Sequence, residues 1–293
     1  MSSRHAAHEI GSPWPARFFG RLYGEIYREH LLAPAQSRRE AAFAARVLGL
    51  RGRRVLDVAA GFGRHAVLLA QRNKVAALDL NAAYLAMARR ELKDPARGNL
   101  ALVRGDMMRL PVAPGAFDAV LLLFNSFGYC DGHGGRCEAD GGHGKNTRWN
   151  ARTDSNLVVL TEAARVLKSG GAMLIELPNS APVIEAVAAA PRRRMAAASY
   201  QIEEEFTYDT SSCVLSNRTI FRKGSETETA GYHLRLYKRR EAEAILRAAG
   251  FSVAAIYGDY AGGSFQADES PMMLIHAHLL NSKKVATMTC AVQ

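Results

Sequence analysis

The stretch from Val55 to His65 reads Val-Leu-Asp-Val-Ala-Ala-Gly-Phe-Gly-Arg-His, and it is the most informative part of the chain. An apolar run leads into a turn with two glycines, and a helical pattern follows from Ala66 to Arg72. A second apolar run, Val75 to Leu80, carries an acid near its end. The acids of the two runs, Asp57 and Asp79, lie about 22 positions apart, which is the length of one strand–helix–strand unit. The pattern therefore predicts two parallel strands joined by a helix.

The turn between these two strands has the chemistry of a nucleoside-binding loop. Gly61 and Gly63 have no Cβ, so the backbone can approach a ligand closely there. Asp79 stands at the carboxyl end of the second strand, where its carboxylate can accept hydrogen bonds from both hydroxyls of a ribose. Together the loop and the acid predict a cradle for a nucleoside.

Two classes of protein share such a loop. Gly61, Gly63 and Ala66 satisfy the G-x-G-x-x-A fingerprint of nicotinamide-binding proteins. Asp57, however, stands inside the first strand, where dinucleotide folds usually keep an apolar residue. About fifty residues with a helical pattern also precede that strand. Both features argue against a nicotinamide-binding protein and favour a different class of nucleoside-binding protein.

Further motifs identify that class by resemblance. They are Gly105-Asp106-Met107, Phe117-Asp118-Ala119-Val120 and the run from Ala164 to Gly171. With the D-x-x-x-G-x-G pattern from Asp57 and the ribose acid, they stand in the order typical of class I S-adenosylmethionine-dependent methyltransferases. The chain resembles that superfamily over roughly residues 45–180. The resemblance implies an α/β fold with a doubly wound, seven-stranded, mostly parallel sheet of the Rossmann-like type and an antiparallel last strand. It also implies S-adenosyl-L-methionine as cofactor.

Composition narrows the class of protein further. The chain has 293 residues, of which 48% are hydrophobic, enough for one large domain or a domain with a lid. No run of eighteen apolar residues occurs, so we expect no membrane span. The N-terminus lacks the pattern of a secretory signal. Four irregularly spaced cysteines indicate reduced thiols, and we expect a cytoplasmic protein.

The formal net charge of +10 raises the question of nucleic acid. Short basic clusters lie at residues 51–54, 192–194 and 238–240, but none is interleaved with aromatic residues as in single-strand binding platforms. We therefore predict an arginine-rich solvated surface and no nucleic-acid partner. A site for an acidic substrate or RNA is the alternative, and a homo-oligomer stays open.

The rest of the chain is arranged around this core. We expect an N-terminal helical lid (1–49), a Rossmann-like core (50–180), a small antiparallel β-rich substrate lobe (181–238), the remainder of the core (239–280) and a tail (281–293). Ser37 and Glu40 have the spacing of a capping box, which predicts a helix from Ser37 to Leu48 that Gly49 closes. The remaining expected strands are 55–59, 75–80, 100–104, 117–124, 172–177, 251–257 and 272–280; the remaining helices are 63–72, 82–92, 155–168 and 239–249.

Residues 131–153 interrupt the core as a flexible insertion, because they contain almost no aliphatic side chains. Cysteine and histidine are zinc ligands, and four of them stand in or beside this segment: Cys130, His133, Cys137 and His143. Their spacing is not that of a regular zinc finger, so we predict no metal site.

The resemblance assigns the cofactor residues. The methionine side would lie along the first strand and the glycine loop, with the ribose on Asp79. The adenine would lie on Leu80 with its amino group toward Asp106 and the Met107 backbone. The end of the fourth strand would meet the methionine ammonium. The residues implied are Asp57, Ala59, Gly61, Gly63, Asp79, Leu80, Asp106, Met107 and Phe124.

The N-terminal helices resemble those of glycine/sarcosine N-methyltransferase-like enzymes. That family has an early tyrosine and an arginine ten residues before a leucine–glycine pair, and Tyr23 and Arg39 occupy comparable places. A guanidinium suits the cofactor carboxylate through two parallel hydrogen bonds. A solvated helix face is the alternative for Arg39, and lid packing is the alternative for Tyr23.

The sequence predicts a small-molecule methyltransferase without a catalytic triad. Methyl transfer is a displacement at a carbon already activated by a sulfonium, so alignment is the main requirement. Tyr129, just past the fourth strand, and Tyr23 are the catalytic candidates, with core packing as the alternative for Tyr129. We expect transfer to nitrogen or carbon of a metabolite, in a natural-product pathway. An RNA or protein methyltransferase, or a cofactor-binding protein without transfer, is the alternative.

Overall fold

The computed structural model describes Phe19, Ile26 and residues 34–91, 98–129, 150–197 and 199–281. The helices are α3 (Pro34–Val47), α4 (Arg64–Leu69), α5 (Ala82–Glu91), α7 (Leu157–Val166), α8 (Ser180–Ala189) and α9 (Arg239–Ala248). The strands are β1 (Arg54–Val58), β2 (Lys74–Asp79), β3 (Leu100–Arg104), β4 (Phe117–Leu122), β5 (Leu167–Pro178), β6 (Arg192–Ala197), β7 (Tyr200–Asp209), β8 (Val214–Lys223), β9 (Glu226–Arg235), β10 (Phe251–Tyr257) and β11 (Met272–Leu279).

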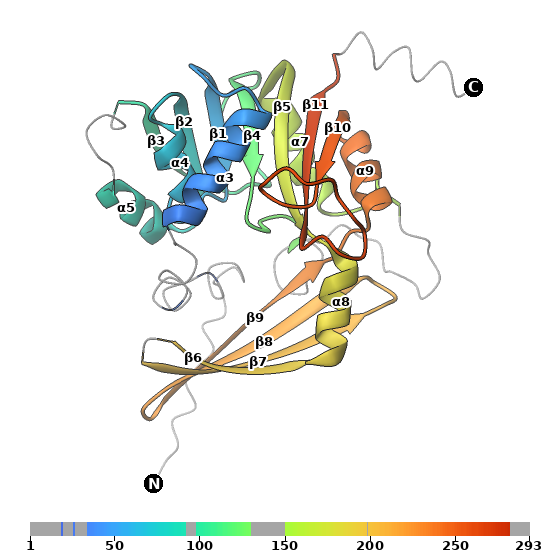
Figure 1. Ribbon diagram of the computed structural model, residues 1–293. Coiled ribbons are helices and arrows are strands. Elements are labelled where there is room, and N and C mark those ends of the chain that lie inside the picture. The colour runs from blue at the N-terminus through green and yellow to red at the C-terminus, as the bar shows by residue number, and fades with distance from the viewer. Residues whose placement is uncertain are drawn as a thin grey trace.

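A seven-stranded sheet forms the centre of the molecule, in the order β10-β11-β5-β4-β1-β2-β3 (Figure 1). Strands β1 to β5 pair in parallel, and β11 runs antiparallel to both β5 and β10. The predicted fold class is confirmed, including the antiparallel last strand. Helices cover both faces of such a sheet, which explains why its strands read as continuous apolar runs.

Two apolar layers lie on opposite faces of this sheet. One layer packs α3 and α4 on Val55, and the other packs α7 and α9 on Leu56 and Val58. Because side chains alternate along a strand, Asp57 points to the same face as Val55. The acid of the first strand therefore lies on the α3 and α4 side, where the glycine loop begins.

The predicted β lobe is a separate antiparallel sheet, β6-β7-β8-β9, below the main sheet with α8 beside it (Figure 1). Sequence reasoning missed α8, whose residues are apolar except for Ser180 and Glu185 and so show little helical periodicity. It also missed β6, where three consecutive arginines hide the period-two pattern. Those charges pair across the strands, with Arg192 2.8 Å from Glu205 and Arg194 3.3 Å from Glu203.

The predicted start of the N-terminal helix is wrong. Helix α3 begins at Pro34, and a proline suits a first helical position because its missing N–H has no partner there. Ser37 and Glu40 lie buried within the helix. Glu40 contacts α4 instead of closing a capping box. The expected end is confirmed, since the helix stops at Val47 and Gly49 has a φ of 59°.

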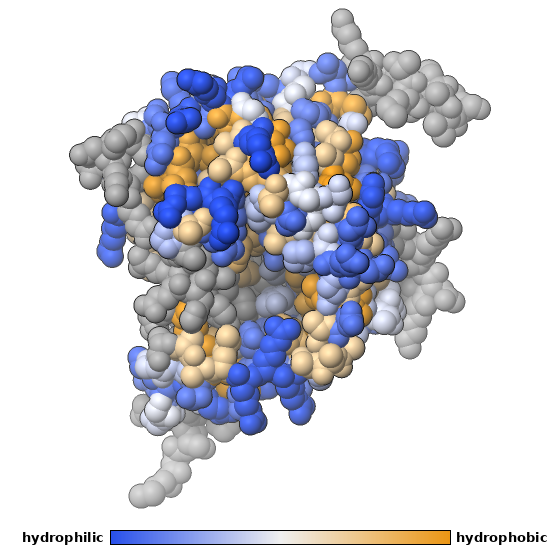
Figure 2. All heavy atoms as spheres, in the orientation of Figure 1, coloured by the Kyte–Doolittle hydropathy of each residue, from blue (hydrophilic) through white to orange (hydrophobic). Residues whose placement is uncertain are grey.

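Hydrophilic residues cover much of the face shown in Figure 2, with apolar residues in small patches between them. Among the helices described, none is long and apolar enough to span a membrane.

Candidate functional site

The carboxyl ends of β1, β2 and β4 meet at one edge of the sheet, and the glycine loop lies there. The loop turns through left-handed conformations at Ala59, Gly61 and Gly63, with φ of 54°, 55° and 72°. A Cβ on Gly61 would meet nothing within 4 Å, whereas one on Gly63 would lie 2.9 Å from the Ala88 Cβ. Gly61 therefore leaves open space for a ligand, and Gly63 allows α5 to pack closely on the loop.

Asp79 braces this loop. Its two carboxylate oxygens accept hydrogen bonds from the backbone N–H groups of Gly61 and Asn81, both at 2.8 Å. Burial raises the pKa of Asp79, and these hydrogen bonds oppose the shift. Each oxygen has a second lone pair, so the carboxylate can also accept from a ribose.

Asp57 is a buried acid with one unsatisfied oxygen. Its residue is 2% exposed, and its Oδ2 has no hydrogen-bond partner. Burial raises its pKa to about 7; the Arg64 guanidinium lowers it and the Asp79 carboxylate raises it further. A cationic group bound beside Asp57 would stabilise its ionised form.

Arg64 and His65 of α4 contact Glu40 of α3. The Arg64 Nη1 donates to the Glu40 carboxylate, and His65 Nε2 lies 2.7 Å from the same carboxylate. Burial alone raises the pKa of Glu40, but the His65 hydrogen bond and the Arg64 charge outweigh it and lower the pKa. The guanidinium also lies over the Phe124 ring, 4.6 Å from its centroid. Its Nη2 is buried without a partner, so one face of this arginine has donors left for a ligand.

Sequence reasoning did not single out Arg64 as a ligand-binding residue. Arg39, the arginine it chose, lies on the exposed side of α3. The signal for Arg64 was its place directly after the glycine loop. Its significance depends on α3, since Glu40 orients the side chain from 24 positions away.

The chain after β4 forms a strained turn. Phe124 and Asn125 have φ of 57° and 53°, so β4 ends at Leu122 and not at residue 124 as expected. The Phe124 N–H donates to the Glu176 Oε2 at 2.7 Å. Next to this bond, the Asn125 Oδ1 and the Ser126 Oγ are buried without partners. The turn thus brings two unsatisfied polar atoms to the edge where Asp57 lies.

The remaining predicted residues have plainer surroundings. Leu80 is half-buried, and Asp106 is exposed with its Oδ1 accepting the Met108 N–H at 2.8 Å. Met107 packs on the core from a half-buried position. Asp106 and Leu80 therefore both keep surface that an adenine could contact.

Tyr129 lies between the core and the lobe. Its ring packs edge-on against Tyr232 at 5.9 Å and Phe19 at 5.6 Å. Next to it, the Gly128 carbonyl accepts the Arg235 N–H at 2.8 Å, which ties the loop after β4 to β9. Tyr23 lies outside the described residues, as do Cys130, His133, Cys137 and His143. Within the described ranges, no three His, Cys, Asp or Glu side chains are grouped to hold a metal.

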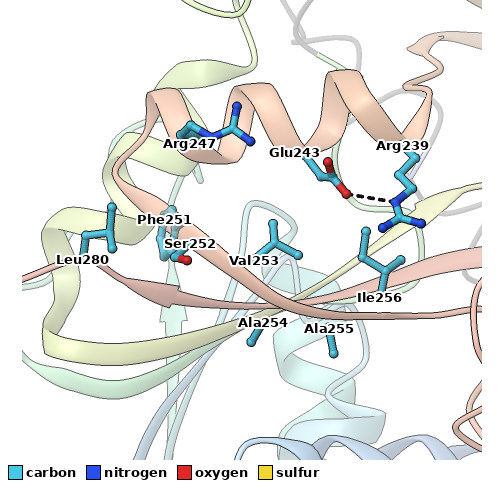
Figure 3. A pocket seen from close by; sticks show the side chains of 10 residues that line it. All are labelled: Arg239, Glu243, Arg247, Phe251, Ser252, Val253, Ala254, Ala255, Ile256 and Leu280. Carbon is cyan, nitrogen blue, oxygen red and sulfur yellow. Dashed lines mark hydrogen bonds and ion pairs between the residues drawn. The ribbon is translucent and has the colours of Figure 1, made fainter. Parts of the chain in front are cut away.

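A separate hollow of about 400 Å³ lies between α9 and the edge strand β10 (Figure 3). An ion pair between Arg239 and Glu243, at 2.9 Å, borders it. None of the predicted site residues lines this hollow, which is formed by Arg239, Glu243, Arg247, Phe251, Ser252, Val253, Ala254, Ala255, Ile256 and Leu280. It is therefore distinct from the site at the glycine loop.

Known proteins share this domain and this fold. A family model described as a methyltransferase domain matches residues 55–134. A demethylmenaquinone methyltransferase of Beutenbergia cavernae is 43% identical over 79 residues, which are 26% of this chain and 31% of that relative. The chain thus spans about a third of the length of that curated relative.

Solved structures match nearly the whole chain. The CcbJ methyltransferase of Streptomyces caelestis superposes with a TM-score of 0.67 at 18% identity, covering 88% of this chain and 98% of that one. CalS10 of Micromonospora echinaspora, an amino pentose methyltransferase solved with its cofactor bound, gives a TM-score of 0.54 at 19% identity over 88% and 97%. At these identities the likeness shows the fold.

The residues at the glycine loop suit S-adenosylmethionine. The ribose of this cofactor needs a hydrogen-bond acceptor such as Asp79. The open space beside Gly61 leaves room for the ligand to lie against the backbone. Its amino-acid end carries one cation and one anion, and the unpartnered atoms Asp57 Oδ2 and Arg64 Nη2 have the opposite charges. The matched domain, the strand order and these two charged atoms are all consistent with binding of S-adenosylmethionine. Residues 55–134 therefore match a methyltransferase domain, within a chain that has the fold of known methyltransferases.

Proposed function

We propose that this chain transfers a methyl group from S-adenosylmethionine to nitrogen or carbon of a small-molecule metabolite of a natural-product pathway. The observation that carries the proposal is a set of buried polar atoms without partners beside the glycine loop and in the turn after β4: Asp57 Oδ2, Arg64 Nη2 and Asn125 Oδ1. Unsatisfied buried polar groups are costly, so a site that keeps several together is suited to a charged ligand.

In this proposal the cofactor lies along the carboxyl ends of the strands. Its methionine part lies on Asp57, Ala59, Gly61, Gly63 and Phe124, its ribose on Asp79, and its adenine near Leu80, Asp106 and Met107. When bound, it supplies an activated methyl group. The protein has to align an acceptor with that methyl and exclude water, and such positioning can contribute on the order of 7–11 kcal/mol.

Two substitutions test whether Arg64 or Arg39 binds the carboxylate at the amino-acid end of the cofactor. Arg64→Gln should lower affinity for S-adenosylhomocysteine about 10-fold, because a charged hydrogen bond to the carboxylate is lost. Arg39→Gln, on the exposed side of α3, should leave the affinity within about 2-fold. Titration calorimetry measures the affinity of both variants. A larger loss in Arg39→Gln than in Arg64→Gln would assign the cofactor carboxylate to Arg39.

The structural relatives support a small-molecule acceptor. CalS10 is named as an amino pentose methyltransferase involved in calicheamicin biosynthesis, and this chain shares its fold. An acceptor amine would enter between the β4 turn and the lobe, where Tyr129 and Tyr232 meet. We therefore expect amino sugars and related amines to be the first acceptors to test.

A screen with S-adenosylmethionine and a panel of amines, followed by mass spectrometry, tests the proposal. A product heavier by one methylene per transfer supports it. Transfer to RNA or protein, and not to small molecules, would favour the alternative substrates. Tight binding of S-adenosylhomocysteine without transfer to any of these classes would favour a cofactor-binding protein.

With an acceptor in hand, Tyr129→Phe and Tyr23→Phe should each reduce kcat about 5-fold, the loss of one hydrogen bond in the transition state. The dissociation constant of S-adenosylhomocysteine should stay within a few-fold of wild type. Tyr200→Phe, in the buried apolar cluster of the lobe, is the matched control and should leave kcat unchanged. If both variants keep full kcat, the two tyrosines only pack.

A further inference from the structure

Glu176 is a buried acid that reaches from one strand of the site to the next. It lies near the end of β5, is 3% exposed, and its Oε2 accepts the Phe124 N–H at 2.7 Å from the end of β4. The same oxygen accepts the Tyr260 O–H at 2.5 Å. Burial of a carboxylate is costly unless the carboxylate is hydrogen-bonded, so the Phe124 N–H and the Tyr260 O–H both stabilise Glu176 in this position.

The turn that Glu176 holds has an unusual backbone. Phe124 and Asn125 are consecutive residues with left-handed φ, and neither is glycine. Left-handed conformations of residues with a Cβ persist only where the surrounding structure holds them. Here the Phe124 N–H is held by Glu176, and the Phe124 ring is covered by the Arg64 guanidinium.

Tyr260 is itself fixed in place. Its ring packs edge-on against Phe43 of α3 at 5.5 Å. The Asp259 carboxylate accepts the backbone N–H groups of Ala261, Gly262 and Gly263, at 2.7 to 3.0 Å, which closes the loop. Burial and the nearby Glu176 charge raise the pKa of Tyr260, so its hydroxyl remains a donor. The position of the Glu176 carboxylate is therefore defined by α3 and by the loop before β11.

The turn presents its free polar atoms at the cofactor edge of the sheet. Strand β4 pairs with β1 so that Leu121 lies beside Asp57, and the turn begins just beyond this pair. The Asn125 Oδ1 and Ser126 Oγ are buried without partners. Both atoms can accept hydrogen bonds from an ammonium group.

We propose that Glu176, fixed by Tyr260, is a positioning residue that holds the Phe124–Asn125 turn in the conformation that binds the amino-acid end of S-adenosylmethionine. Glu176 acts through the Phe124 N–H and does not touch the cofactor. The inference rests on the cofactor assignment and is independent of the methyl acceptor.

Two probe ligands test the proposal by calorimetry. S-adenosylhomocysteine has the amino-acid end, whereas methylthioadenosine lacks it and keeps the nucleoside. Glu176→Leu should weaken S-adenosylhomocysteine about 10-fold and leave methylthioadenosine within about 2-fold. Glu176→Gln should restore wild-type binding of both, because its amide oxygen can accept the same two donors.

Two further variants keep the test decisive. Tyr260→Phe retains the packing on Phe43 and should weaken S-adenosylhomocysteine about 3- to 10-fold, which decides the question if Glu176→Leu does not fold. Asp118, at the opposite end of β4, also accepts a backbone N–H, that of Arg54 at 2.8 Å. Asp118→Leu is the matched control and should leave the binding of both ligands unchanged.

Hydrogen exchange of the peptide containing Phe124 gives a second readout. Exchange should accelerate in Glu176→Leu and stay slow in Glu176→Gln. Equal losses for the two ligands, or unchanged S-adenosylhomocysteine binding in folded Glu176→Leu, would overturn the proposal. Absence of any methyl acceptor would overturn the proposed function and leave these ligand ratios unaffected.

Discussion

Asp79→Ala should lower the affinity for S-adenosylhomocysteine about 10- to 100-fold in a folded protein, because the charged acceptor that we propose for the ribose hydroxyls is lost. The structure adds a second reason for a large effect. Asp79 also accepts the Gly61 N–H at 2.8 Å, so its removal frees the glycine loop, where we propose that the cofactor binds. Calorimetry with wild type and variant measures the change.

Asp209→Ala is a matched control for this prediction. Asp209 lies in the lobe and braces a turn by accepting the Ser211 backbone N–H at 3.0 Å. Its removal should not alter the binding of S-adenosylhomocysteine. Unchanged affinity in folded Asp79→Ala would refute the ribose assignment, and tight binding of a nicotinamide dinucleotide would favour a dehydrogenase.

Asp154→Ala should destabilise the fold by about 3–5 kcal/mol, because it removes one partner of a buried ion pair. The Asp154 carboxylate accepts the Tyr237 O–H at 2.9 and 3.0 Å and lies 3.3 Å from the Arg235 Nε. The Asp154 and Arg235 side chains are 0% and 6% exposed. Urea denaturation followed by circular dichroism measures the free energy of unfolding.

An exposed pair on α9 provides the comparison. Arg239 and Glu243 lie one helical turn apart at 2.9 Å, and Glu243→Ala should cost only about 0.3–0.5 kcal/mol. Arg235 keeps other partners in Asp154→Ala, among them the Ser212 carbonyl at 2.7 Å and Glu241 at 3.4 Å, which places the expected loss toward the lower end of its range. A loss no larger than that of Glu243→Ala would show that Asp154 does not stabilise the junction of core and lobe.

Elements with a strong local pattern were predictable from the sequence. The unit from β1 through α4 to β2 has apolar runs of strand length, a glycine turn and an acid at a fixed distance. These signals depend only on residues close together in the chain, so they can be recognised without knowledge of the fold. Helix α9 was equally clear, because its buried residues recur with helical spacing.

Elements without such a pattern were missed. Helix α8 is mostly apolar and has no clear polar face, and its packing against the lobe is visible only when β7, β8 and β9 are in place. The three arginines of β6 look like a solvated charge cluster until glutamates of β7 lie opposite them. In both cases the stabilising partner is remote in sequence.

Residue types along the chain were enough to predict the glycine loop and Asp79, which stand within one strand–helix–strand unit, and the class of fold, which follows from the order of short motifs over residues 45–180. The side chains that surround the loop could be identified only in the folded protein. Arg64 is aimed by Glu40 from α3, and Glu176 meets Tyr260 across 84 positions of sequence. The same Glu176 oxygen accepts the Phe124 N–H of the left-handed turn. Such contacts arise from the order of strands and the packing of helices on them, and no local pattern specifies which distant residues a sheet will bring together.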